Sequence, residues 1–169
     1  LTNTVLFPGV VIPINAGRDK SIKLIKDANK SSKLIGVVAQ RNINDENPGS
    51  ENIYEVGTVA KILRVLKMPD GNTTFILQGK KRFKIKSIVK NDPYIQATVD
   101  PVSDEVLKKS NSKFSATIDA IKDIALKIIK ENPNIPSDAS FAIKNIHSSS
   151  FLINFVSSNM NISVKDKQE

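Results

Sequence analysis

The sequence predicts an α+β protein in which a compact β subdomain is followed by a helical subdomain. In residues 1–100, apolar residues occur in short runs that Pro, Gly and Asn separate, a pattern typical of strands and turns. From residue 104 onward they recur at steps of three and four, which is the spacing of one helix face. The change follows Asp100-Pro101, so we expect a β subdomain over residues 1–102 and an α subdomain over residues 103–169.

The composition excludes several classes of protein. The 169 residues contain no cysteine and one histidine, His147. Disulfide scaffolds, thiolate zinc sites and cysteine nucleophiles are therefore excluded, and one histidine cannot supply a multi-histidine metal site. No apolar run reaches the roughly 18 residues of a membrane span, and no signal peptide opens the chain. We expect a cytoplasmic protein with no membrane partner, no metal and no catalytic residue in this chain.

The first part of the chain predicts a strand–helix–strand unit. Residues 10–14 form an apolar run, in which Pro13 favours an edge strand or a bulge. Asp19 is the expected N-cap of the helix, and residues 34–39 indicate a buried strand. One face of the helix carries Ile22, Ile25 and Ala28.

Further segments raise the expected total to six or seven short strands with one helix. A polar loop over residues 42–52 comes first. The sequence Met-Pro-Asp-Gly-Asn at residues 68–72 then predicts the turn of a hairpin, because Pro fixes one turn position and Gly supplies a positive φ. The expected strands are residues 4–7, 56–66, 73–77, 83–89 and 94–99.

Three helices are expected in the second part. The first lies within residues 104–131 and starts either near Ser110-Asn111-Ser112 or as early as Asp104. Its apolar stripe is Phe114, Ile118, Ile121, Ala125 and Ile128, which Ile124 and Ile129 widen. The second spans residues 136–146, with Ala139, Ala142, Ile143 and Ile146 facing inward. Ser148 caps the third, whose buried face is Phe151, Leu152, Phe155 and Val156. Because single helices cannot bury these stripes, we expect them to pack together or against the β subdomain.

The last residues indicate the start of one more helix. Ser163 can cap it, and Asp166 lies three residues further on, near the positive end of the helix dipole. Only about two helical turns fit before the sequence stops, so we expect this chain to be part of a longer protein.

The net charge of +8 is concentrated in one segment, residues 80–90, which holds six basic residues and no acidic one. Nucleic-acid binding through Lys80, Arg82, Lys84 and Lys86 is one interpretation. However, these residues alternate with Phe83 and Ile85, which is typical of a half-buried strand with a solvated face. The chain also has no tryptophan and two tyrosines with which to stack bases.

No constellation of catalytic residues is present. Gly79-Lys80-Lys81 resembles the end of a phosphate-binding loop, but position 74 is Thr where that loop needs Gly, and position 81 lacks the magnesium-binding hydroxyl. His147 falls between two expected helices and indicates a surface or capping residue.

Two segments resemble the ATP-dependent Lon proteases. Residues 3–14, Asn-Thr-Val-Leu-Phe-Pro-Gly-Val-Val-Ile-Pro-Ile, are similar to the opening of that family. A second similar stretch contains Gly57-Thr58, Met68-Pro69-Asp70-Gly71, Leu77-Gln78-Gly79 and Arg82-Phe83. The resemblance continues more loosely through the helical half and so covers essentially the whole chain.

The resemblance implies the N-terminal region of a Lon protease, with a PUA-like β subdomain followed by a helical subdomain. Such proteases also carry an AAA+ ATPase module, which uses ATP and magnesium, and a protease domain with a Ser–Lys dyad. Neither has its motifs in these residues, so we expect this chain to be non-catalytic and to need no cofactor. The implied partners are misfolded or unfolded protein substrates and further copies of the same protein in a hexamer.

From the residues we expect an apolar bend to capture unfolded chains, because such chains expose apolar side chains and unpaired backbone. The candidate substrate-binding residues are Leu6, Phe7, Pro8, Val10, Met68 and Pro69. Burial of Phe7 and Val10 in the core is the competing interpretation. Two alternatives of other classes are an oligomerisation or spacer module and a nucleic-acid-binding module.

Overall fold

A computed structural model describes the chain except for residues 68–72, 104–111, 134 and 136–137. It divides into two compact units, one of Leu1–Ser103 with Met160–Glu169 and one of Asp104–Asn159. The first unit contains β1 (Val11–Ala16), α1 (Asp19–Asn29), β2 (Leu34–Val37), the 3₁₀ helix η1 (Ser50–Asn52), β3 (Val56–Lys67), β4 (Thr73–Lys90), β5 (Gln96–Pro101) and α5 (Val164–Gln168). The second contains α2 (Ser112–Glu131), α3 (Asp138–Lys144) and α4 (Ser149–Asn159). The predicted α+β class is confirmed.

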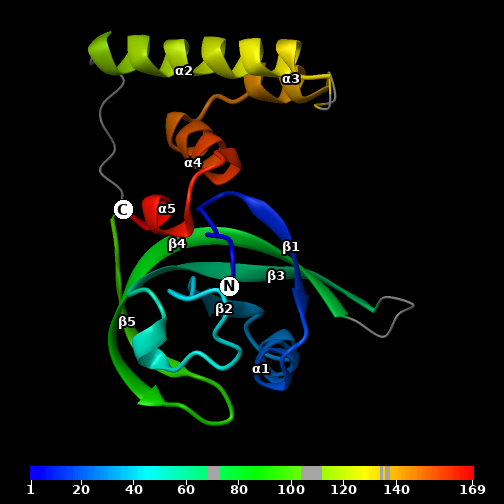
Figure 1. Ribbon diagram of the computed structural model, residues 1–169, viewed down its shortest axis with the longest axis vertical. Helices are drawn as coiled ribbons and strands as arrows, with labels where there is room; N and C mark the ends of the chain where they lie inside the picture. The colour runs from blue at the N-terminus through cyan, green and yellow to red at the C-terminus, as the bar shows by residue number, and fades with distance from the viewer. Residues whose placement is uncertain (68–72, 104–111, 134, 136–137) are drawn as a thin grey trace. The chain divides into compact units, whose positions relative to one another are not determined.

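All strand pairs of the sheet are antiparallel, in the order β1-β4-β3-β2, and β5 pairs with β4. The described residues form five strands rather than six or seven. Residues 4–7 form no strand, and the two strands expected at 73–77 and 83–89 are one continuous strand, β4, which curves along the sheet (Figure 1). A register shift against β3 between Gly79 and Arg82 marks an irregularity that takes up extra residues without ending β4.

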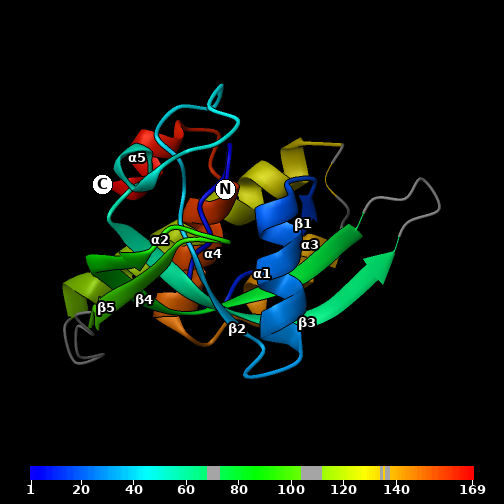
Figure 2. The ribbon, with the colours of Figure 1, turned by 90° about the horizontal axis from the view of Figure 1, so that it is seen from below.

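Helix α1 lies against one face of the sheet, which we call the core face (Figures 1 and 2). The predicted apolar face of the helix is confirmed: Ile25 and Ala28 are buried in this core, and Ile22 packs against it. The helix begins at Asp19, and Arg18 is the N-cap without a side-chain hydrogen bond, so Asp19 is not the cap that we expected. Its carboxylate lies instead in the first turn, where the helix dipole favours negative charge.

The sheet supplies the rest of the core through alternate residues. The buried strand residues are Ala16, Ile35, Val37, Ala60, Ile62, Phe75 and Leu77. Because side chains alternate along a strand, the residues between these point to the opposite face of the sheet, which we call the outer face.

In the helical unit, Ile118, Ile143 and Leu152 form the buried centre of the core. Around it pack Phe114, Ile121, Ala125, Leu126, Ile129, Ile146, Phe155 and Val156. The expectation was wrong for Ile124, Ile128 and Ala142, which are exposed. The stripe of α2 therefore follows a narrower arc than the apolar residues alone indicate.

Two predicted helix caps are confirmed. Ser148 Oγ accepts a hydrogen bond from the Phe151 amide at 3.2 Å, at the start of α4. Ser163 Oγ accepts one from the Asp166 amide at 3.1 Å, and the Ser163 hydroxyl donates to Asp166 Oδ2 at 2.7 Å. The sequence predicted residues 160–169, which include α5, as part of the α subdomain. In the structure, Met160–Glu169 group instead with Leu1–Ser103, in the unit that we call the β-rich unit.

None of the helices in the described ranges has the length and apolar character that crossing a bilayer requires.

Candidate functional site

The apolar bend expected to bind substrates is buried. Leu6, Phe7 and Val10 are 3%, 8% and 7% exposed, and Pro8 is buried as well. Met68 and Pro69 lie outside the described residues. The competing interpretation, placement of Phe7 and Val10 in the interior, therefore describes this bend better than a surface that a client chain can reach.

The bend is buried because its backbone is tied to the sheet. Val10 N donates to Phe7 O at 3.2 Å across Pro8-Gly9, and Gly9 has a φ of 81°, as a type II turn requires. Gly9 N donates to Gly79 O and Gly79 N donates to Val10 O, both at 2.9 Å. A side chain at Gly79 would collide with the Phe7 carbonyl, so glycine allows this close approach.

The outer face of the sheet carries a group of apolar residues that remain reachable. Val11, Leu34, Leu63 and Leu66 are between 43% and 48% exposed.

The strand register arranges the outer face in rows. In one row Val11 and Leu34 are aligned, with Gln78 and Lys61 between them. A second row contains Pro13, Ile76 and Arg64, with Leu63 at the adjacent register shift. A third row ends at Leu66, opposite Thr74.

Polar groups interrupt this apolar surface. Lys61 and Arg64 are exposed. Thr74 Oγ1 donates to Asn15 Oδ1 at 2.6 Å, which links β4 to β1 across the third row. The outer face thus presents separate apolar side chains among basic and amide groups, a surface suited to extended chains of varied sequence. The alternation of residues along β1 is the signal that could have revealed this face. Val11, Pro13 and Asn15 alternate with the residues of β1 that point to the core face.

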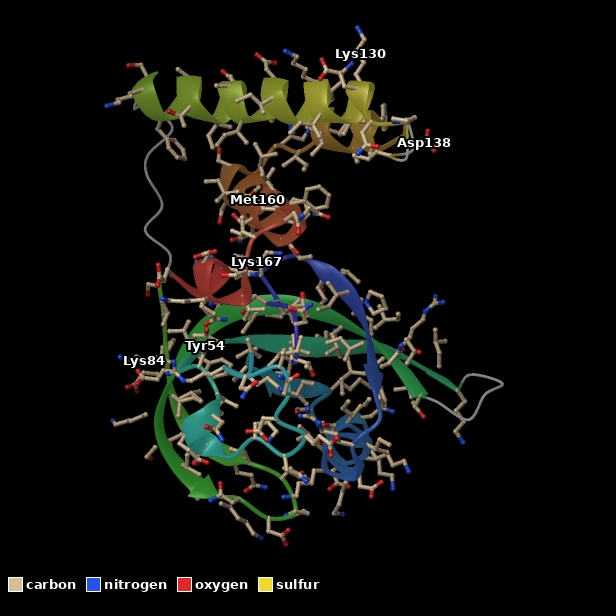
Figure 3. The ribbon with its side chains drawn as sticks, viewed as in Figure 1. Tyr54, Lys84, Lys130, Asp138, Met160 and Lys167 are labelled. Atoms are coloured by element: carbon tan, nitrogen blue, oxygen red, sulfur yellow. The ribbon has the colours of Figure 1, made fainter. Side chains whose placement is uncertain are left out.

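The basic residues proposed for nucleic-acid binding follow one strand, but several have protein partners. Lys80 Nζ donates to Gln78 Oε1 at 2.7 Å, and Lys84 Nζ lies 3.3 Å from Glu55 Oε2. Arg82 is half-buried and also has an interaction partner, whereas Lys86 is exposed. Figure 3 shows Lys84 at the surface of the β-rich unit.

A polar cluster around the buried Gln40, which the sequence did not predict, organises the loop after β2. Gln40 is 2% exposed, and its Nε2 donates to Asn42 O at 2.6 Å and to Asp45 O at 3.1 Å. Arg18 Nη2 donates to Gln40 Oε1 and to Asp45 O, each at 3.1 Å. These groups satisfy one another, so the cluster shapes the loop. In the described ranges, no three His, Asp or Glu side chains lie together as metal ligands would.

Comparison with known proteins identifies the fold and the family. A solved structure of the N-terminal domain of the Mycobacterium avium complex Lon protease covers 99% of this chain and is itself covered to 84%, with a TM-score of 0.78 at 18% identity. The Lon N-terminal domain protein of Xanthomonas campestris gives a TM-score of 0.52 at 15% identity, with 95% of each chain covered. The fold is that of a Lon N-terminal domain.

Sequence similarity gives the family. The model of the ATP-dependent protease La (LON) substrate-binding domain matches residues 1–169. Lon proteases of Flavobacterium johnsoniae and Cytophaga hutchinsonii are 65% and 52% identical over 99% of this chain, which spans 21% and 20% of their lengths. The chain belongs to the family of LON substrate-binding domains, as the resemblance predicted. It spans about a fifth of these relatives.

Proposed function

We propose that this chain captures unfolded or misfolded protein substrates for an ATP-dependent Lon protease, through the outer face of its sheet. The observation that carries the proposal is the group of half-exposed apolar side chains Val11, Leu34, Leu63 and Leu66 on that face. The match to a substrate-binding family supports the same assignment.

The chemistry of the outer face fits a client without a fixed sequence. An unfolded chain exposes apolar side chains, which gain free energy when they leave water. Complete burial of a leucine contributes about 1.5–3 kcal/mol, and these residues are already half-buried, so each contact contributes less. Binding by one copy is therefore weak. Several copies in a hexamer would strengthen it through effective concentration.

We infer that the chemistry of the whole protein lies outside these residues. ATP hydrolysis with magnesium and peptide cleavage by a Ser–Lys dyad belong to modules that the family resemblance implies and this chain does not include. The chain is accordingly expected to bind a client without cutting it.

The test is a titration of the chain with a fluorescently labelled, chemically denatured protein. The triple variant Leu34→Ser, Leu63→Ser and Leu66→Ser should lose most of the binding. A variant with Ile124→Ser and Ile128→Ser is the matched control, because both isoleucines are exposed but lie on α2. Equal binding by the folded triple variant and the wild type would remove the outer face as the site.

Assembly is a second candidate function, favoured by exposed apolar residues of the helical unit. Phe141 is 73% exposed, and Ile124 and Ile128 are also exposed. Sedimentation over a range of concentrations tests it. Self-association that Phe141→Ser and Ile128→Ser abolish, without any client binding, would favour assembly over capture.

A further inference from the structure

Beyond substrate capture on the outer face, we propose that the free edge of β4 over residues 86–90 binds an extended, acidic segment of a protein as an added antiparallel strand. The added strand would lie on the same side of β4 as β3, along the part of β4 that extends past the start of β3. The proposal rests on the pairing of β4, on its charge, and on one contact within the chain that already has this geometry.

The edge is open because β3 is shorter than β4. The register between them begins at Val56, which lies opposite Lys84. Past that point Ile85 N donates to Glu55 O at 2.8 Å, and the rest of β4 pairs only with β5 in the described part of the chain. An unpaired edge of this kind is a template for another strand.

Glu55 shows which side chains suit this edge. It directly precedes β3 on the line that the added segment would follow, and its carboxylate lies 3.3 Å from Lys84 Nζ. The same residue therefore supplies both a backbone acceptor and an acidic side chain to β4. Further along the strand, Lys86 and Lys90 are exposed and have no acidic partner among the described residues.

The surroundings favour an acidic protein segment over nucleic acid. Residues 80–90 hold six basic residues and no acidic one, so the strand attracts negative charge. Val89 is 66% exposed beside these lysines, which gives the edge an apolar contact as well. Stacking platforms for bases are absent from residues 80–90, where the single aromatic residue, Phe83, is buried. The preferred ligand alternates acidic and apolar residues.

The experiment uses the isotope-labelled chain and a capped peptide of about six residues in which Glu and Val alternate, the typical length of a strand. Binding should shift the NMR signals of residues 86–90 and protect their amides from exchange. A peptide of alternating Lys and Val should bind at least about tenfold more weakly, because it places like charges against the strand. Added salt should weaken the binding of the acidic peptide.

Variants separate this edge from other sites. Lys86→Glu with Lys90→Glu should reduce affinity at least about tenfold, whereas Lys127→Glu with Lys130→Glu on α2 is the matched control and should leave it unchanged. The triple serine variant of the outer face should also bind the acidic peptide normally. Loss of binding in that variant would assign the peptide to the outer face and overturn the inference.

Two further outcomes overturn the proposal. An acidic peptide that is methylated at every backbone nitrogen cannot donate to β4, so equal affinity would show that charge alone holds the ligand. Single-stranded DNA that binds at the same salt concentration, shifts residues 86–90 and displaces the peptide would assign the edge to nucleic acid.

Discussion

At the scale of single residues, two glycines create the space that the ring of Phe83 occupies. Phe83 is buried on β4, beside Gly36 of β2 and Gly57 of β3. A Cβ at Gly57 would lie 2.7 Å from Phe83 Cζ and 2.7 Å from the carbonyl oxygen of Val37. Because one of these neighbours is backbone, the site cannot relax through a side-chain rotation alone.

Gly57→Ala should therefore destabilise the chain by about 1–3 kcal/mol, the usual cost of overpacking a core. Chemical denaturation followed by circular dichroism measures the change. Gly17→Ala is the control, since no atom lies within 4 Å of a Cβ built there. Equal stability of the two variants would contradict this description of the core.

Thr58 provides a second prediction at this scale. It is 4% exposed, and its hydroxyl donates to Leu6 O at 2.6 Å, which ties the buried bend to β3. Thr58→Val keeps the shape but leaves that carbonyl without its donor, at a cost of about 1–3 kcal/mol.

The control for this prediction is Thr74→Val, which removes the exposed hydrogen bond to Asn15 and should change the free energy of unfolding by less. A Thr58→Val variant as stable as the wild type would mean that water satisfies the Leu6 carbonyl.

At the scale of elements, the sequence predicts the order of strands and helices well and the site poorly. Apolar periodicity is local, so it places α1, β3 and the inner face of α4 to within a few residues, whereas α2 buries a narrower stripe than the periodicity predicts. It cannot predict that β4 continues through Gly79, because the irregularity there depends on pairing with β3. Nor can it predict the burial of Leu6–Val10, which depends on contacts with the distant Gly79 and Thr58.

The loop after β2 gives a prediction for a whole element. The Gln40 amide donates to the carbonyls of Asn42 and Asp45 and accepts from Arg18, so one side chain holds the loop in shape. Gln40→Ala should lower the free energy of unfolding by about 1–3 kcal/mol, since it removes several partly buried hydrogen bonds at once.

Hydrogen exchange separates this effect from a general loss of stability. Amides of residues 41–53 should exchange faster in Gln40→Ala, while those of β3 and β4 should change only as the global stability does. Uniform acceleration over both strands and the loop would show that Gln40 supports the core and not this element.

At the scale of the whole molecule, the outer face and the free β4 edge share one unit of the chain but differ in chemistry. The outer face offers separate apolar side chains among Lys61 and Arg64. The β4 edge offers backbone groups and two exposed lysines, Lys86 and Lys90, which have no acidic partner in the described part of the chain. A client with both apolar and acidic stretches would engage the two surfaces together, and their contributions would combine through effective concentration.

The number of copies should matter more than the strength of any one contact. We expect a single copy to bind a denatured protein weakly, and the same chain displayed in six copies on a ring-shaped scaffold to bind it at least about a hundredfold more tightly. The reason is that an unfolded client carries several apolar segments, so each further contact is intramolecular. Surface plasmon resonance with the client immobilised at low density measures both affinities.

The triple serine variant on the same scaffold is the control. It should lose the gain in affinity, because repeating a contact that is absent adds nothing. If the displayed chain folds normally and its affinity rises only in proportion to the number of copies, neighbouring copies cannot engage one client at the same time.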